Sequence, residues 1–198
     1  MKVLRSLAGL TLFLLIASLG VAIAQQRDGA AAPPRPPGMR LTSTSWPDGG
    51  QIPVKHTSQG MSISPALQWS SVPPGTVSFV LLFKDPDVAQ NKGLGDVTHW
   101  LVWNIPGAAT GLPEGVPTGA QMPDGSRQVS LRGPQYMGPG AGANGPFHHY
   151  TLELYALDTA TDIPPGANAN ETRANVFKAI DGHVLAKAVY VGLYHQTQ

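Results

Sequence analysis

Cysteine is missing from the sequence, and its absence rules out two common ways of holding a small fold together. Without Cys, the 198-residue chain can form neither a disulfide framework nor a thiolate metal site. Charge is scarce and nearly balanced, with 13 Lys and Arg residues against 12 Asp and Glu residues. A chain without a basic excess gives no reason to expect nucleic acid or an anionic membrane surface as a partner. No internal repeat is visible.

The only long apolar run lies at the N-terminus. Lys2 and Arg5 precede an apolar run over residues 7–23, and Ala22-Ile23-Ala24 forms a small-x-small cleavage site. This pattern predicts a signal peptide over residues 1–24, and hence a periplasmic or secreted protein without stable membrane insertion after cleavage. The run is at the short edge of a bilayer span, so an uncleaved signal anchor is the alternative. No Cys follows the run, which excludes a lipid-anchored lipoprotein.

The remaining chain is predicted to hold a linker and one domain. Residues 25–39 contain four prolines and little to bury, which predicts a stiff, extended Pro-rich linker. From residue 40 to residue 198, strand-sized pieces alternate with Gly and Pro turns, which predicts a mainly β domain with one or two small helices. The continuous apolar run 78–85 predicts a strand buried on both faces. Strands are predicted over 40–44, 66–69, 99–105, 150–157 and 184–194, and a helix over 170–181 capped by Asn170.

A Gly- and Pro-rich loop over residues 136–147 leads directly into His148, His149 and the strand that follows. Small residues in this loop, including Gly138 and Gly140, can bring bare backbone close to a small ligand. Adjacent residues on a strand face opposite sides, so His148 and His149 cannot share one pocket, whereas Tyr150 shares the face of His148. The loop and His148 are therefore predicted to form one wall of a pocket.

Polar side chains are also predicted at the ends of two other apolar strands. Asp85-Pro86-Asp87 follows one strand and His99 opens another. Taken alone, the first motif favours a capped turn, in which the Asp side chains accept from nearby backbone N–H groups. A lone His at a strand start is by itself a weak signal. In an antiparallel sheet an exit lies beside an entry, so Asp85, His99 and His148 are expected to meet at one edge.

These segments, taken together and in this order, resemble the phosphatidylethanolamine-binding protein family, also called Raf kinase inhibitor proteins, and in particular its exported bacterial branch. The resemblance extends over about residues 41–194. The matching segments are Ile63-Ser64-Pro65-Ala66-Leu67-Gln68-Trp69, Val72-Pro73-Pro74-Gly75-Thr76, Asp85-Pro86-Asp87, His99-Trp100-Leu101-Val102-Trp103-Asn104-Ile105-Pro106, His148-His149-Tyr150, Leu154-Tyr155-Ala156-Leu157-Asp158 and Gly182-His183-Val184-Leu185-Ala186.

The resemblance implies a β sandwich with a large central sheet and a pocket for phosphate-like anions or phospholipid headgroups. It implies that the pocket is lined by Asp85, Asp87, His99, Gly138, Gly140, His148 and Tyr150. Two departures stand out: Ala141 and Gly142 occupy positions where the family usually has Pro-Pro, and His149 replaces an Arg. They predict a more flexible rim and the loss of a fixed cation beside the pocket.

Three classes of function follow from this reading. The first is a non-catalytic binding protein for a small anion or a phospholipid headgroup, with no cofactor, catalytic residue or metal ligand. The second, suggested by the family's inhibitors, is a protein that binds a protein partner such as an envelope protease. The third is a metal-dependent enzyme, because Asp and His side chains can form an N/O site for Zn or Mn.

Overall fold

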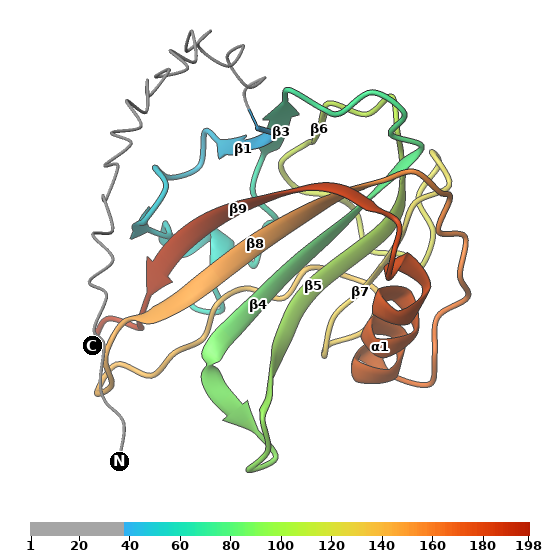
Figure 1. Ribbon diagram of the computed structural model, residues 1–198. Helices are drawn as coiled ribbons and strands as arrows, with labels where there is room; N and C mark the ends of the chain where they lie inside the picture. Colours follow the sequence, from blue (N-terminus) through green and yellow to red (C-terminus); the bar gives the residue numbers. More distant parts are fainter. Residues whose placement is uncertain (1–37) are drawn as a thin grey trace, which may run out of the picture. The chain divides into compact units, whose positions relative to one another are not determined.

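The computed structural model describes residues 38–198 (Figure 1). The predicted signal peptide and residues 25–37 of the predicted linker lie outside this range. The first strand of the described domain begins at Arg40. Among residues 38–198, no helix is both long enough and apolar enough to cross a membrane.

The domain is a β sandwich built from one large and one small sheet. The large sheet has six strands in the order β2-β9-β8-β4-β5-β7, and the small sheet has three in the order β1-β3-β6. All pairs are antiparallel except β2 with β9. The elements are β1 (Arg40–Ser43), β2 (Gly50–Gln51), the 3-10 helix η1 (Val54–His56), β3 (Leu67–Ser70), β4 (Ser78–Gln90), β5 (Gly95–Pro106), β6 (Gly111–Leu112), β7 (Arg127–Val129), β8 (His148–Leu157), α1 (Ala169–Ile180) and β9 (Val184–Tyr194). The predicted mainly β sandwich is confirmed.

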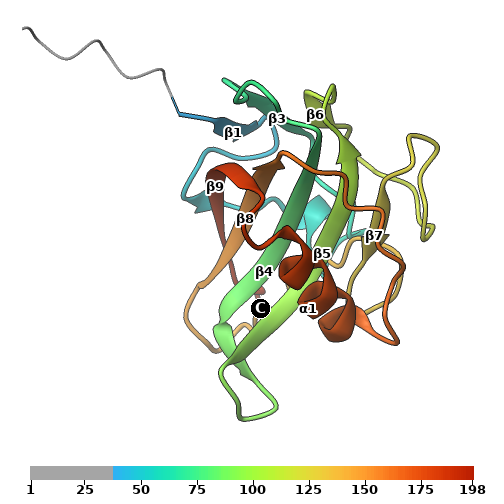
Figure 2. The same ribbon diagram turned by 45° about the vertical axis from the view of Figure 1, so that its right-hand side comes forward.

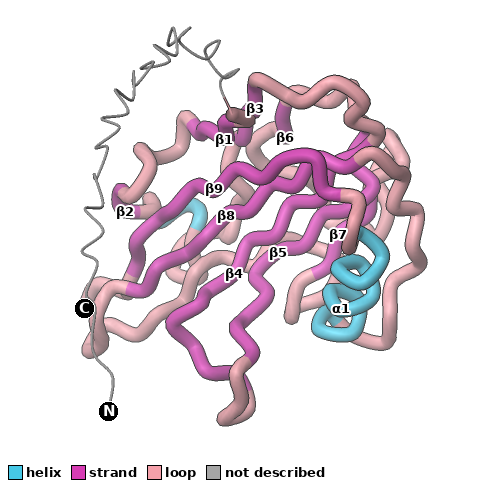
Figure 3. The backbone as a smooth tube through the Cα atoms, in the orientation of Figure 1, coloured by secondary structure: helices cyan, strands magenta, loops and turns pink. Residues whose placement is uncertain are grey.

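Strand β4 is buried on both faces, as its continuous apolar sequence predicts. Phe79, Leu81 and Phe83 face the small sheet and join a core that includes Trp69 of β3. Val80 and Leu82 point to the opposite face, in the core that α1 covers with Val176 and Ile180. Figure 2 shows α1 lying across this outer face, and Figure 3 shows η1 on the other side of the sheet. A strand placed between two cores has no solvent face, so after the buried Ser78 at its start polar residues appear only toward its end.

Two strand boundaries differ from the prediction. Strand β4 does not end at Asp85 but continues through Pro86 to Gln90, and β5 begins at Gly95, four residues before His99. The pairing of β4 with β8 stops at Lys84, and the register with β5 shifts between Asp85 and Gln90. Because β4 has lost one neighbour there, the missing N–H of Pro86 costs no ladder bond. The two strands therefore project beyond the sheet as a hairpin.

The predicted N-cap residue of the helix was wrong by two residues. Asn168, not Asn170, is the N-cap: its side chain accepts a hydrogen bond from the Glu171 backbone N–H at 3.0 Å. Asn168 has an extended backbone, which allows this contact. Asn170 lies inside α1, and its amide donates to Gln90 on the β4–β5 hairpin at 3.1 Å.

Candidate functional site

A cavity of about 490 Å³ lies at the end of the large sheet where β8 begins, and we call it the His99–His148 cavity. It is an open cavity lined by residues of β4, β5 and β8, of the loop before β8, and of the segments that follow η1, β7 and β9. Of the residues predicted to form the pocket, those lining this cavity are Asp85, His99, Gly138, Gly140, His148 and Tyr150. The antiparallel register brings them together, because Asp85 follows directly after the last β4 residue that pairs with β8.

Asp85 is buried and is held by hydrogen bonds on both carboxylate oxygens. It is 3% exposed; Oδ2 accepts from His148 Nδ1 at 2.8 Å, and Oδ1 accepts from the Asp87 backbone N–H at 3.0 Å. The capped turn and the shared pocket, which the sequence left as alternatives, therefore occur together. Since Nδ1 of His148 donates to Asp85, its Nε2 is the ring atom left for a ligand.

His99 is fixed in a similar way but by a backbone carbonyl. Its Nδ1 lies 2.9 Å from the carbonyl oxygen of Met137, and because a carbonyl only accepts, the proton sits on Nδ1. The ring is 5% exposed and packs edge-on against Tyr150, with ring centroids 5.1 Å apart. Burial lowers the pKa of His99, while the Met137 carbonyl and Asp85 act in the opposite direction. At neutral pH its Nε2 is therefore an acceptor.

Tyr150 ties the Gly-rich loop to the floor of the cavity. Its hydroxyl oxygen accepts hydrogen bonds from the backbone N–H groups of Gly140 at 3.2 Å and Ala141 at 3.1 Å. Burial raises the pKa of Tyr150, and the neighbouring Asp85 charge adds to this, so the hydroxyl stays protonated. These two loop N–H groups are therefore hydrogen-bonded within the protein.

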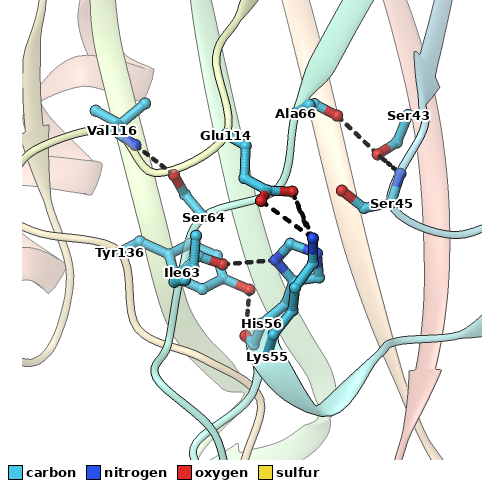
Figure 4. A network of polar contacts seen from close by, with 10 residues as sticks. All are labelled: Ser43, Ser45, Lys55, His56, Ile63, Ser64, Ala66, Glu114, Val116 and Tyr136. Carbon is cyan, nitrogen blue, oxygen red and sulfur yellow. Dashed lines mark hydrogen bonds and ion pairs between the residues drawn. The ribbon is translucent and has the colours of Figure 1, made fainter.

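Gly138 serves packing rather than a close approach to ligand. A Cβ atom at this position would lie 2.6 Å from the Thr57 carbonyl carbon and 2.8 Å from the His56 oxygen. The Tyr136 hydroxyl donates a hydrogen bond to the His56 carbonyl oxygen in the same segment, at 3.0 Å (Figure 4). The loop and the segment 56–58 thus touch backbone to backbone, which only Gly permits.

Asp87 does not line the cavity. It lies on the projecting part of β4, where its Oδ2 accepts from the His149 backbone N–H at 2.6 Å and from His149 Nδ1 at 2.9 Å. The His149 N–H lowers the pKa of Asp87. His148 and His149 therefore face opposite sides of β8, as strand alternation predicts, and each pairs with a different Asp.

Asp85, Asp87 and His148 also place potential metal-ligand atoms within 4.8 Å of one another. Within residues 38–198, His99 does not belong to this cluster, so the Asp, Asp, His, His set is not assembled. The hydrogen bonds among these side chains and His149 already account for their arrangement.

A buried polar network around η1 supports the wall that the loop packs against (Figure 4). His56 is fully buried, and its Nδ1 lies 2.7 Å from the Ile63 carbonyl oxygen. Its Nε2 has no hydrogen-bond partner and lies 3.9 Å from Glu114 Oε2. Glu114 in turn pairs with Lys55 at 2.9 Å. Burial lowers the pKa of His56.

Comparison with known proteins gives the same picture over almost the whole domain. The family model described as phosphatidylethanolamine-binding protein matches residues 42–195. The chain belongs to this family. A UPF0098 protein of Methanothermobacter thermautotrophicus is 39% identical over 80% of this chain and 99% of its own length. The crystal structure of Escherichia coli YbcL, described as a member of the mammalian PEBP family, covers 81% of this chain and 100% of its own, with 28% identity and a TM-score of 0.66. A candidate lipoprotein of Mycobacterium tuberculosis, LppC, is 30% identical over 83% of this chain and 78% of its own length.

Membership of the phosphatidylethanolamine-binding protein family supports a binding protein. Among the residues that line the cavity, three polar ones were not predicted from the sequence. Ser58 and Gln196 come from segments far apart in the chain, and Arg132 comes from the turn after β7. Arg132 places a cation beside the cavity, although His149 stands where the family usually has Arg. Sequence spacing could not show that the turn carrying Arg132 lies beside the cavity.

Stability is expected to fall as pH is lowered through the histidine range. In the folded state the pKa values of His99 and His56 are lowered from the ordinary histidine value of 6.5. As the pH falls below 6.5, the unfolded chain therefore binds more protons at these residues than the folded chain does. The stability that these two histidines contribute is therefore fully present above pH 6.5, and it is lost as the pH falls toward their folded-state pKa values. Melting temperatures between pH 8 and pH 5 measure this, and the slope should be smaller for His99→Gln than for the original protein. Replacement of the half-buried His195 by Gln serves as the control; equal slopes for all three proteins would contradict the assignment.

Proposed function

We propose that this protein is a non-catalytic binding protein that holds a small oxyanion, a phosphate or a phosphate-containing headgroup, in the His99–His148 cavity. One observation carries the proposal. The cavity brings together two imidazoles whose Nδ1 atoms are both occupied by protein acceptors, at 2.9 Å for His99 and 2.8 Å for His148. Each ring is thereby held in one orientation with Nε2 available to a ligand.

The two rings offer different chemistry to an oxyanion. His99, kept neutral by burial, accepts at Nε2 and suits the O–H of a protonated phosphate oxygen or a bridging water. His148 lies 2.8 Å from the Asp85 carboxylate through Nδ1, and in the imidazolium form its Nε2 is a donor. Such an arrangement binds and orients an anion. It contains no activated nucleophile, which favours binding over catalysis.

We also propose that the protein is exported, because its N-terminal sequence has the pattern of a signal peptide. Lys2, Arg5 and the apolar run that follows have the order of a signal peptide. A periplasmic or secreted binding protein without cysteine depends on core packing alone, and the two cores on either side of β4 supply this.

Sulfate binding measured by isothermal titration calorimetry tests the proposal, because sulfate keeps its charge between pH 5 and pH 8. Affinity should rise as pH falls, since protonation of an imidazole adds both a donor and a positive charge. His148→Ala should lower the affinity at pH 6 about 10-fold, as expected for the loss of one charge-assisted hydrogen bond.

A third His–Asp pair, at the other end of β8, provides a matched control. His183 Nδ1 lies 2.8 Å from Asp158 Oδ1, the same contact as in the cavity, but at an exposed turn before β9. His183→Ala should leave sulfate affinity unchanged. Affinity that stays constant or rises with pH, or equal effects of the two substitutions, would refute the proposed function.

A further inference from the structure

Arg132 lies between two cavities and lines both of them. One is the His99–His148 cavity; the other, of about 170 Å³, we call the Met61 cavity. The turn that carries Arg132 is held by hydrogen bonds of its backbone. Its N–H donates to Ser130 Oγ at 3.1 Å, and its carbonyl accepts from Gln135 Nε2 at 3.3 Å. The backbone of Arg132 is therefore held in place, and the residue lines both cavities.

The guanidinium of Arg132 is not used to hold the fold. Within residues 38–198 it forms no ion pair and no hydrogen bond, whereas Arg127 pairs with Asp162 and Arg173 pairs with Asp96. An unpaired guanidinium beside a cavity that also contains a buried carboxylate compensates the negative charge that an anion would bring. Its planar set of donors matches the oxygens of a phosphate group in a bidentate manner.

A second unused donor faces the same space. Ser58 lines the His99–His148 cavity, and its Oγ is buried and has no hydrogen-bond partner among residues 38–198. A buried hydroxyl without a partner costs free energy unless a ligand or a water satisfies it. Arg132, Ser58 and His148 therefore supply donors to one anion from different elements of the fold.

The Met61 cavity indicates what is attached to that anion. Apart from Arg132 its lining is uncharged and carries hydroxyl and amide groups: Met61, Ser62, Val116, Thr118, Gln135 and Tyr136. Such groups suit the hydroxyls of a small polyol. No carboxylate lines this cavity, so an ammonium group placed there would meet only the positive charge of Arg132.

We propose that Arg132 joins the two cavities into one site for a phosphate ester of a small uncharged polyol, with glycerol phosphate as the representative ligand. The phosphate lies between Arg132, Ser58 and His148, and the polyol extends past Arg132 into the Met61 cavity. This assignment rests on the proposed function, because it requires an oxyanion in the His99–His148 cavity.

Calorimetric titrations with inorganic phosphate, glycerol 1-phosphate and phosphoethanolamine test the assignment. Glycerol phosphate is expected to bind several-fold more tightly than the other two. Arg132→Gln should weaken phosphate and glycerol phosphate alike by about 10-fold to 100-fold, as for the loss of charged hydrogen bonds. Arg132→Lys should recover part of this loss, because Lys keeps the charge but not the bidentate geometry.

Two further variants separate the contributions. Thr118→Val removes one hydroxyl from the Met61 cavity and should abolish the preference for glycerol phosphate without changing phosphate affinity. Arg40→Gln removes one arginine from β1, outside both cavities, and should change neither. The glycerol phosphate group could belong to a phospholipid or to a free ester. Co-sedimentation of the protein with phosphatidylglycerol vesicles indicates the lipid headgroup, and its absence indicates the free ester.

The outcomes distinguish this inference from the proposed function. If phosphate binding depends on His148 but not on Arg132, or if phosphoethanolamine binds more tightly than glycerol phosphate, this inference is wrong and the anion site stands. If no anion binds in a manner that depends on His148, the proposed function fails, and this assignment fails with it.

Discussion

Replacing Asp85 with Ala should lower the free energy of unfolding by about 2–4 kcal/mol. The substitution removes a buried carboxylate that accepts from His148 Nδ1 and from the Asp87 backbone N–H. Both donors are left without their partner, and each such loss costs about 1–3 kcal/mol. Urea denaturation measures the change. The His148 ring would also lose the contact that fixes its orientation, so anion affinity should fall in the same variant.

Asp87→Ala is the matched control for this prediction. Asp87 is also paired with a His, but its side chain is 39% exposed and water replaces the lost contacts. An effect below about 1 kcal/mol is expected for such an exposed pair. Asp85→Asn, which keeps an acceptor for His148, should lose less than Asp85→Ala. If Asp85→Ala is instead as stable as Asp87→Ala or more stable, the buried carboxylate is kept for ligand binding at a cost in stability.

Gly138→Ala should destabilise the protein by about 1–3 kcal/mol and distort the cavity. The added Cβ would meet backbone atoms of Thr57 and His56 at 2.6 and 2.8 Å, and backbone cannot move aside as a side-chain end can. The loop must therefore shift away from the segment 56–58, which widens the cavity between them. Denaturant unfolding and anion titration measure the two effects.

Gly142→Ala in the same loop provides the comparison. A Cβ atom at Gly142 has no heavy atom within 4 Å, and the residue is exposed. Its effect on stability should lie between zero and a gain of about 1 kcal/mol, because Ala restricts the unfolded chain. Equal losses for the two variants would show that loop flexibility, rather than contact with the wall, makes Gly necessary at position 138.

Much of the fold could be predicted because the deciding information is local. Residues 79–83 of β4 are all apolar, and only a strand covered on both faces accepts such a sequence. The same alternation separates His148 from His149. Asp85, His99 and His148 could be brought together because neighbouring antiparallel strands of a sheet place their ends side by side.

The remainder depended on contacts between distant segments. Pro86 reads as a strand end, and only the loss of the β8 neighbour after Lys84 allows β4 to continue through it. Asn168 and Asn170 are equally good caps by residue type, and the choice depends on where the chain leaves the preceding loop. Arg132 and Ser58 reach the cavity through a turn and a loop, for which no periodic pattern exists.

The contact between Tyr150 and the loop has a consequence for the time course of binding. The backbone N–H groups of Gly140 and Ala141 donate hydrogen bonds to the Tyr150 hydroxyl oxygen within the protein itself. A molecule that enters the cavity finds this wall in place, so no closing motion on the microsecond-to-millisecond scale has to precede or follow it. Association is then governed by diffusional encounter and the departure of water, and differences among ligands appear in how long each one stays.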